Sequence, residues 1–146
     1  MLFVYGTLQD ADILSAVLGR PTDTTSLRPA TAPGFRAVAY PGRVYPALTA
    51  AATDSAPGLL LDALSETDIA LLDAFEGEEY RRQTIAVKAG GALYEADAYL
   101  PVAVISSAAP AWSLPDWTAM HKPAVLGQER ATAMALRQRL SSQAPS

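Results

Sequence analysis

The residues best placed for chemistry are a glutamate, Glu76, and a short turn, Gly6-Thr7-Leu8, that follows an apolar segment. Glu76 stands at the predicted C-terminal end of a helix and beside apolar Phe75. The negative end of a helix dipole and an apolar neighbour both raise the pKa of a carboxyl group. A glutamate with a raised pKa suits general acid–base catalysis near neutral pH. Spacing alone, however, favours the simpler interpretation that Glu76 is a solvated acid in a polar loop.

The turn Gly6-Thr7-Leu8 belongs to a junction between a strand and a helix. Leu2-Phe3-Val4-Tyr5 predicts a buried strand, and a helical pattern begins soon after the turn. Such a junction directs backbone N–H groups outward, and the N-terminus of a helix favours anions. We therefore expect a carboxylate or a phosphate to bind at the turn. The carboxylate of an amino acid fits this turn better than a phosphate does. The amino acid also carries an ammonium group, which can donate a hydrogen bond or a proton to Glu76 on the opposite side.

The composition limits the classes of function. The chain has 146 residues, of which 50% are hydrophobic, and we expect one domain over residues 1–140 with a disordered tail over 141–146. The net charge is −4 and basic residues are scattered, so no nucleic-acid partner and no membrane partner are predicted. Without a cysteine and with one histidine, the chain has no thiolate nucleophile and no cysteine or two-histidine metal site.

The ends and apolar runs of the sequence indicate its class. No basic segment precedes the short apolar stretch at the N-terminus, so a secretory signal is not predicted. No apolar run approaches the roughly 20 residues that a membrane-spanning helix needs. We expect a soluble, cytoplasmic protein.

The order of predicted elements is that of an α+β domain with a mixed, barrel-like sheet. Helical spacing covers Asp10–Leu18, and a second helix begins at Ser65, a good N-cap, and ends at Gly77. Gly90-Gly91 predicts a hairpin. Further predictions are short bent strands over 28–53, a strand over 58–61, hairpin strands over 82–87 and 92–100, a short helix from Pro115, and a helix over 123–140.

Two motifs together resemble the gamma-glutamylcyclotransferase-like family, in the branch of the gamma-glutamylamine cyclotransferases and the plant avirulence-induced proteins. The first is Val4-Tyr5-Gly6-Thr7-Leu8, and the second is Leu72-Asp73-Ala74-Phe75-Glu76-Gly77 followed by Tyr80-Arg81. Tyr45-Pro46-Ala47-Leu48 and Ala98-Tyr99-Leu100 also fit. The resemblance covers about residues 1–100. It implies an α+β fold, a small mixed β-barrel with flanking helices.

The resemblance also implies a reaction and a set of site residues. In this family the α-amine of a gamma-glutamyl group attacks its own side-chain carbonyl, which releases an amine and leaves 5-oxoproline. No cofactor or metal is needed, and the partner is the small gamma-glutamyl substrate. Glu76 matches the catalytic general acid/base. The residues implied to bind substrate are Tyr5, Gly6, Thr7, Leu8, Tyr80 and Tyr99.

Several alternatives stay open. Tyr5 is equally a core tyrosine with a satisfied hydroxyl group, and Tyr99 has even odds of a pocket role. Arg81 is expected to pair with Asp73. The chain is alternatively a non-catalytic small-molecule-binding or regulatory module with the same pocket, or an interaction domain whose C-terminal segment contacts a partner. A monomer or weak homodimer is expected.

The leaving group is not defined by the sequence. Only three residues separate Glu76 from Tyr80, fewer than in longer relatives of the family, which places leaving-group specificity in doubt. We expect loops over 20–27, 41–46 and 101–116 to form the pocket walls.

Overall fold

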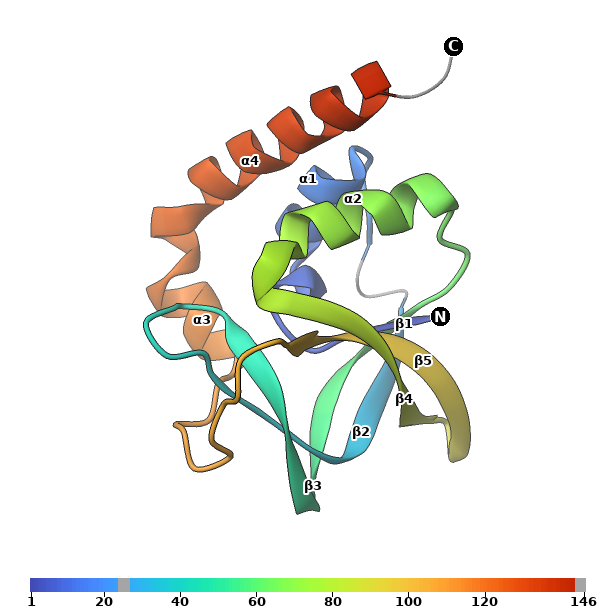
Figure 1. Cartoon of the computed structure of the whole chain (residues 1–146), viewed down its shortest axis with the longest axis vertical. Coiled ribbons are helices and arrows are strands. Elements are labelled where there is room, and N and C mark those ends of the chain that lie inside the picture. Colours follow the sequence, from blue (N-terminus) through green and yellow to red (C-terminus); the bar gives the residue numbers. More distant parts are fainter. Residues whose placement is uncertain (24–26, 144–146) are drawn as a thin grey trace.

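A closed barrel of five strands carries helices over one end (Figure 1). The computed structural model describes residues 1–23 and 27–143. Around the barrel the strands follow the order β1-β3-β2-β4-β5. In the part described, the strands are β1 (Leu2–Val4), β2 (Arg28–Ala39), β3 (Pro46–Leu61), β4 (Tyr80–Ala89) and β5 (Ala92–Pro101), and the helices are α1 (Ala11–Leu18), α2 (Glu66–Glu76), α3 (Leu114–Met120) and α4 (Lys122–Gln143), with short 3₁₀ turns η1 (Thr7–Gln9) and η3 (Gly77–Glu79).

The sheet is mixed because of β1. This strand pairs antiparallel with β3, where Val4 is opposite Leu59, and parallel with β5, where Leu2 is opposite Asp97. The predicted hairpin is confirmed: β4 and β5 pair antiparallel around Gly90 and Gly91, which have φ angles of 57° and 80°. Positive φ at both turn positions is what a two-residue hairpin turn requires. The α+β barrel predicted from the sequence is therefore confirmed.

The region 28–53 differs from the prediction of short bent strands. Its residues belong to two long strands, β2 and β3, which pair antiparallel over most of their length. Pro33 and Gly34 produce a shift in register within β2 and leave the strand continuous. The residues 58–61, predicted as a separate strand, are the end of β3. Proline is tolerated at bulges and strand starts, so these prolines mark an irregularity and a turn without dividing the strands.

Both early helices begin at a capping residue, of which Ser65 was predicted from the sequence. Asp10 accepts a hydrogen bond from the N–H of Ile13 and caps α1. Ser65 and Asp68 form a capping box at the start of α2, in which each side chain accepts from the other residue's N–H. Asp68 also pairs through both oxygens with the guanidinium of Arg20, at 2.8 and 2.9 Å. This ion pair joins α2 to the chain after α1.

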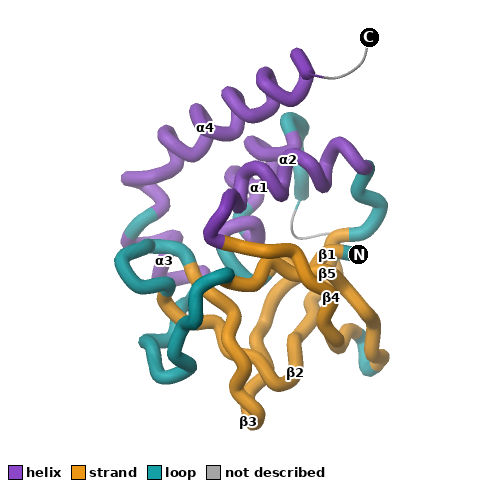
Figure 2. Tube along the Cα trace, viewed as in Figure 1, coloured by secondary structure: helices purple, strands orange, loops and turns teal. Residues whose placement is uncertain are grey.

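Two hydrophobic clusters meet at β1. Leu2 and Val4 face the helices, where they pack with Leu14 of α1 and Leu72 of α2. Phe3 and Tyr5 face the barrel interior with residues of the other strands. Alternation along a strand places successive side chains on opposite faces. The three-residue strand β1 therefore contributes side chains both to the barrel core and to the helical layer. Figure 2 shows the layer of strands and the layer of helices.

The C-terminal helix lies across α1 and α2 (Figure 1). Lys122 pairs with Asp10 at 2.8 Å and with Asp12 at 2.7 Å, and Arg137 donates to the carbonyl oxygen of Ala16. The helix continues through Gln143, into the tail that the sequence predicts from 141, and residues 144–146 lie outside the described residues. None of the helices within the described ranges is both long and apolar enough to cross a bilayer.

The segment before α4 packs on the barrel. Trp117 is 2% exposed, and the indole N–H of Trp112 donates to the carbonyl oxygen of Val44 at 2.9 Å. His121 is the C-cap residue of α3. The tryptophans of this segment thus contribute to intramolecular packing.

Alanine substitutions at two glycines, one in β3 and a control in α4, test how closely β1 and β3 must approach. A Cβ at Gly58 would lie 2.3 Å from the carbonyl oxygen of Val4, so Gly58→Ala is expected to lower the free energy of unfolding by about 1–3 kcal/mol. A Cβ at Gly127 of α4 meets nothing within 4 Å, so Gly127→Ala is expected to raise it by about 0.5–1 kcal/mol. Urea denaturation of both variants measures the difference. Equal effects would contradict the close approach.

Candidate active site

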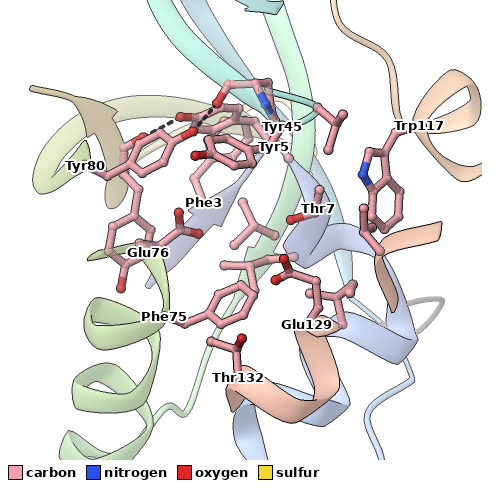
Figure 3. A pocket seen from close by; sticks show the side chains of 18 residues that line it. Phe3, Tyr5, Thr7, Tyr45, Phe75, Glu76, Tyr80, Trp117, Glu129 and Thr132 are labelled. Carbon is pink, nitrogen blue, oxygen red and sulfur yellow. Dashed lines mark hydrogen bonds between the residues drawn. The ribbon is translucent and has the colours of Figure 1, made fainter. Parts of the chain in front are cut away.

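A cavity of about 200 Å³ opens where the barrel meets the helices (Figure 3). At about 30 Å³ per water molecule in the liquid, it has the capacity of roughly seven waters, enough for a small organic group. The end of β1 and η1 form one side, the start of β3 and the end of α2 form others, and α3 and α4 complete it. The lining residues are Phe3, Val4, Tyr5, Gly6, Thr7, Leu8, Ile13, Val44, Tyr45, Pro46, Phe75, Glu76, Tyr80, Tyr99, Trp117, Val125, Glu129 and Thr132.

Glu76 projects into this cavity from the last residue of α2 (Figure 3). Gly77, with a φ of 71°, turns the chain sharply away immediately afterwards. Within the described residues, the Glu76 carboxylate has no hydrogen-bond or ion-pair partner. Burial among the cavity walls, together with the negative charge of Glu129, raises its pKa to about 8. The raised pKa predicted from the sequence is present, with burial as its main cause.

The turn at η1 supplies hydrogen-bond donors. In this 3₁₀ turn the carbonyl oxygen of Gly6 accepts from the N–H of Gln9, and that of Thr7 accepts from the N–H of Asp10. The N–H groups at the start of such a turn have no partner inside it. No acceptor in the described chain takes the N–H groups of Gly6, Thr7 or Leu8. The same cavity thus contains free donors and an unpaired carboxyl group.

Gly6 allows η1 to lie close to β3. A Cβ at this position would stand 2.9 Å from Cγ of Pro46, closer than carbon atoms approach in a packed interior. Pro46 starts β3 and lines the cavity beside Tyr45. The glycine therefore permits the approach that closes this side of the cavity.

Three predicted tyrosines line the cavity, and their hydroxyl groups bond to the protein. Tyr5 donates to the carbonyl oxygen of Tyr99 at 2.5 Å, and Tyr80 donates to that of Pro46 at 2.5 Å. Tyr99 donates to Oδ1 of Asp73 at 2.7 Å. Both interpretations of Tyr5 from the sequence hold in part, because it is a buried tyrosine with a satisfied hydroxyl group and also a cavity wall.

The tyrosines do not compete with Glu76 as bases. Desolvation by burial raises the pKa of Tyr5, Tyr80 and Tyr99 well above the ordinary value, and burial with the neighbouring Glu79 raises that of Tyr45 to about 12. These groups stay protonated across the physiological range. Glu76, with a pKa of about 8, is therefore a better base near neutral pH than any of these tyrosines.

The predicted pairing of Arg81 with Asp73 is wrong. Arg82 contacts Asp73 at 3.0 Å and Asp97 at 2.9 Å. Successive residues of β4 point to opposite faces, and the face that carries Arg82 is the one that meets α2. Asp73 then receives the Tyr99 hydroxyl group as well. This arrangement holds α2, and with it Glu76, against the β4–β5 hairpin.

The prediction of the cavity walls was correct only in part. Val44, Tyr45 and Pro46 come from the predicted region 41–46, whereas the described residues of 20–27 and of 101–116 do not line the cavity. The helices α3 and α4 form that wall instead, through Trp117, Val125, Glu129 and Thr132. A signal for Glu129 was present in the sequence: it lies four residues from Val125 and from Ala133, so an acid interrupts the apolar stripe of its helix.

Comparison with known families settles the relationship of this chain. The family model described as "Gamma-glutamyl cyclotransferase, AIG2-like" matches residues 2–119. The chain belongs to this family. The matched range of this AIG2-like chain contains both sequence motifs, β1 to β5 and all of α3 except its last residue, and it ends before α4.

The curated relatives are plant proteins. The AIG2-like chain is 37% identical over 86 residues to "AIG2-like protein D" of Arabidopsis thaliana and 35% identical over 86 residues to "AIG2-like protein A" of the same plant. These matches cover 59% of the chain and 55% and 50% of the two relatives, so the chain matches about half the length of each.

The fold also occurs among solved structures. The solution structure of At5g39720.1 from Arabidopsis thaliana has a TM-score of 0.66 and 26% identity, over 87% of this chain and 85% of that one. The solution structure of At3g28950.1 from the same plant has a TM-score of 0.66 at 21% identity, over 89% of this chain and 79% of that one, and shows likeness of fold.

The raised pKa of Glu76 predicts a pH-dependent stability. Between about pH 4.5 and pH 8 the unfolded chain loses the Glu76 proton while the folded chain keeps it, so this group makes the fold less stable as pH rises. Glu76→Gln, which stays neutral, is expected to melt at a higher temperature than the unmodified protein at pH 8.5 and at nearly the same temperature at pH 4.5. Thermal unfolding followed by circular dichroism measures this. A constant difference across the range would contradict the assignment.

Proposed function

We propose that this protein is a cyclotransferase that releases 5-oxoproline from a small gamma-glutamyl amine or peptide, with Glu76 as general acid and base. One observation carries the proposal: an unpaired carboxyl group with a pKa of about 8 shares a small cavity with the free N–H groups of η1. Membership of the cyclotransferase family supports the same class of reaction.

The two parts of the cavity match the two ends of the reacting group. The N–H groups of Gly6, Thr7 and Leu8 suit the α-carboxylate of a gamma-glutamyl group, because the start of a helical turn favours negative charge. Glu76 then accepts a hydrogen bond from the α-ammonium on the same carbon. Binding at these two points bends the glutamyl side chain back toward its own amine. Since the nucleophile is tethered to the carbonyl, much of the entropic barrier of a bimolecular reaction is absent.

The α-nitrogen gives up two protons in this reaction, and Glu76 transfers both. Glu76 removes the first proton from the α-ammonium, and the amine nitrogen attacks the side-chain carbonyl carbon to form the ring bond. As the tetrahedral intermediate collapses, Glu76 gives this proton to the leaving nitrogen and the original amide bond breaks. Glu76 then takes the second proton from the ring nitrogen and passes it to the released amine. No water is consumed, and the products are 5-oxoproline and the amine as an ammonium ion.

The aromatic walls keep the reaction away from water. Tyr5, Tyr80 and Tyr99 present their rings to the cavity, since their hydroxyl groups bond to Tyr99, Pro46 and Asp73. A cavity with few competing hydrogen-bond donors strengthens the interaction between Glu76 and the ammonium. We assign these tyrosines a role in shaping the substrate pose.

Substitution of Glu76 tests the assignment directly. Glu76→Gln keeps the size of the side chain and removes its acid–base function, so 5-oxoproline release from gamma-glutamyl conjugates is expected to fall by about 10²–10⁴-fold. Glu78→Gln makes the same change two residues further on, at an exposed side chain, and is expected to retain activity. Chromatographic quantitation of 5-oxoproline measures both.

The outcomes separate the proposal from its alternative. Substantial turnover by Glu76→Gln would overturn the role of Glu76. Binding of a gamma-glutamyl conjugate by the unmodified protein without any 5-oxoproline would favour the non-catalytic binding module. A lack of both would overturn the substrate class.

The pH profile tests the same group in the unmodified protein. General-base catalysis needs ionised Glu76, so kcat/KM is expected to rise about tenfold per pH unit below pH 8 and to level off above it. Initial rates between pH 5.5 and pH 9.5 at low substrate concentration give the free-enzyme pKa. A profile that is flat from pH 5.5 to pH 8 would assign the base to another group.

A further inference from the structure

A second carboxyl group faces the cavity from α4. Glu129 points into the same space as Glu76, from a different helix (Figure 3). It lies outside the residues that match the family, which end at 119. Within the described chain no hydrogen bond or ion pair engages its carboxylate. Family membership therefore assigns this group no role.

No positive charge on the protein compensates the two acids. The described residues that line the cavity include no lysine, arginine or histidine. The basic residues nearest to Glu129 along α4 are engaged with α1: Lys122 pairs with Asp10 and Asp12, and Arg130 lies 3.7 Å from Asp12. A half-buried carboxylate without a partner is costly unless a ligand supplies the opposite charge.

We propose that Glu129 binds a cationic nitrogen on the leaving amine, so that the preferred substrates are gamma-glutamyl conjugates of diamines that carry no carboxylate on the leaving group. This inference rests on the proposed function. When Glu76 binds the α-ammonium group of the glutamyl part, Glu129 still has no positively charged partner. The leaving group is the remaining part of the substrate that can carry one. A carboxylate on the leaving group would meet a like charge.

Other wall residues favour the same ligand. Thr132 lies one turn beyond Glu129 on α4 and lines the cavity with it, which adds a hydroxyl acceptor for an ammonium group. Tyr45, Tyr80 and Trp117 present aromatic rings to the cavity. The face of an aromatic ring attracts a cation and does not attract an anion. Glu129 is thus a residue that determines which amine leaves.

Three substrates of equal length test the inference. They are the gamma-glutamyl conjugates of 1,4-diaminobutane, of n-pentylamine and of 5-aminopentanoate, whose far ends are cationic, neutral and anionic. For the unmodified protein, kcat/KM is expected to be about tenfold to a hundredfold higher for the diamine conjugate than for the neutral one, and lowest for the anionic one. Glu129→Gln is expected to abolish this preference, measured as the ratio of kcat/KM for the diamine conjugate to kcat/KM for the neutral conjugate.

Two further variants complete the design. Glu95→Gln makes the same substitution at an exposed side chain of the β4–β5 hairpin and is expected to keep the full preference. Calorimetric titration of Glu76→Gln, with and without Glu129→Gln, measures binding of the same conjugates when turnover is absent. The diamine conjugate is expected to bind Glu76→Gln about tenfold more tightly than the neutral one does, and Glu129→Gln is expected to remove the difference.

The results distinguish the two proposals. If 5-oxoproline is released but Glu129→Gln leaves the preference for the diamine unchanged, the role of Glu129 is overturned and the cyclotransferase proposal stands. If no conjugate is turned over but the diamine conjugate binds in a Glu129-dependent manner, the cyclotransferase proposal fails and the cation site stands. If no conjugate binds or reacts, both are overturned.

Discussion

The double pairing of β1 is the constraint on which the rest of the structure depends. This strand closes the barrel by pairing with β3 on one side and β5 on the other. Its alternate side chains belong to two cores, with Phe3 in the barrel and Leu2 and Val4 under the helices. Two residues separate β1 from η1, so the position of η1 is fixed relative to both the barrel and the helices. The donors of the candidate site therefore lie directly after a strand that is held from both sides.

Glu76 shows how the site opposes the stability of the fold. Burial next to Glu129 raises its pKa, so the ionised form that the proposed catalysis requires is the form the folded state disfavours. Nearby ion pairs and hydrogen bonds keep Glu76 in place despite this cost. Arg82 bridges Asp73 and Asp97, and Asp73 receives the Tyr99 hydroxyl group, which fastens α2 to the hairpin just before the chain reaches Glu76. These contacts keep the carboxyl group in the cavity against its tendency to reach water.

The features predictable from sequence were the local ones. The cap at Ser65, the turn at Gly90-Gly91 and the end of α2 at Gly77 each follow from the chemistry of one or two residues. The length of β2 and β3 did not, because a register shift absorbs Pro33 and Gly34 only when a partner strand is present. The contribution of α4 to the cavity depends on how a distant helix packs. Glu129 in the apolar stripe was its one visible trace.

The attachment of α4 has a consequence for how this architecture diversifies. The helix is joined to the body by side-chain ion pairs from Lys122 to Asp10 and Asp12 and by apolar packing, and no strand pairing crosses that boundary. The barrel and the N-terminal turn form one closely joined unit, and α4 is a separate segment that packs on it. Exchanging that one segment would change the cavity wall that carries Glu129 without disturbing the register of any strand, a route open both to natural divergence and to engineering.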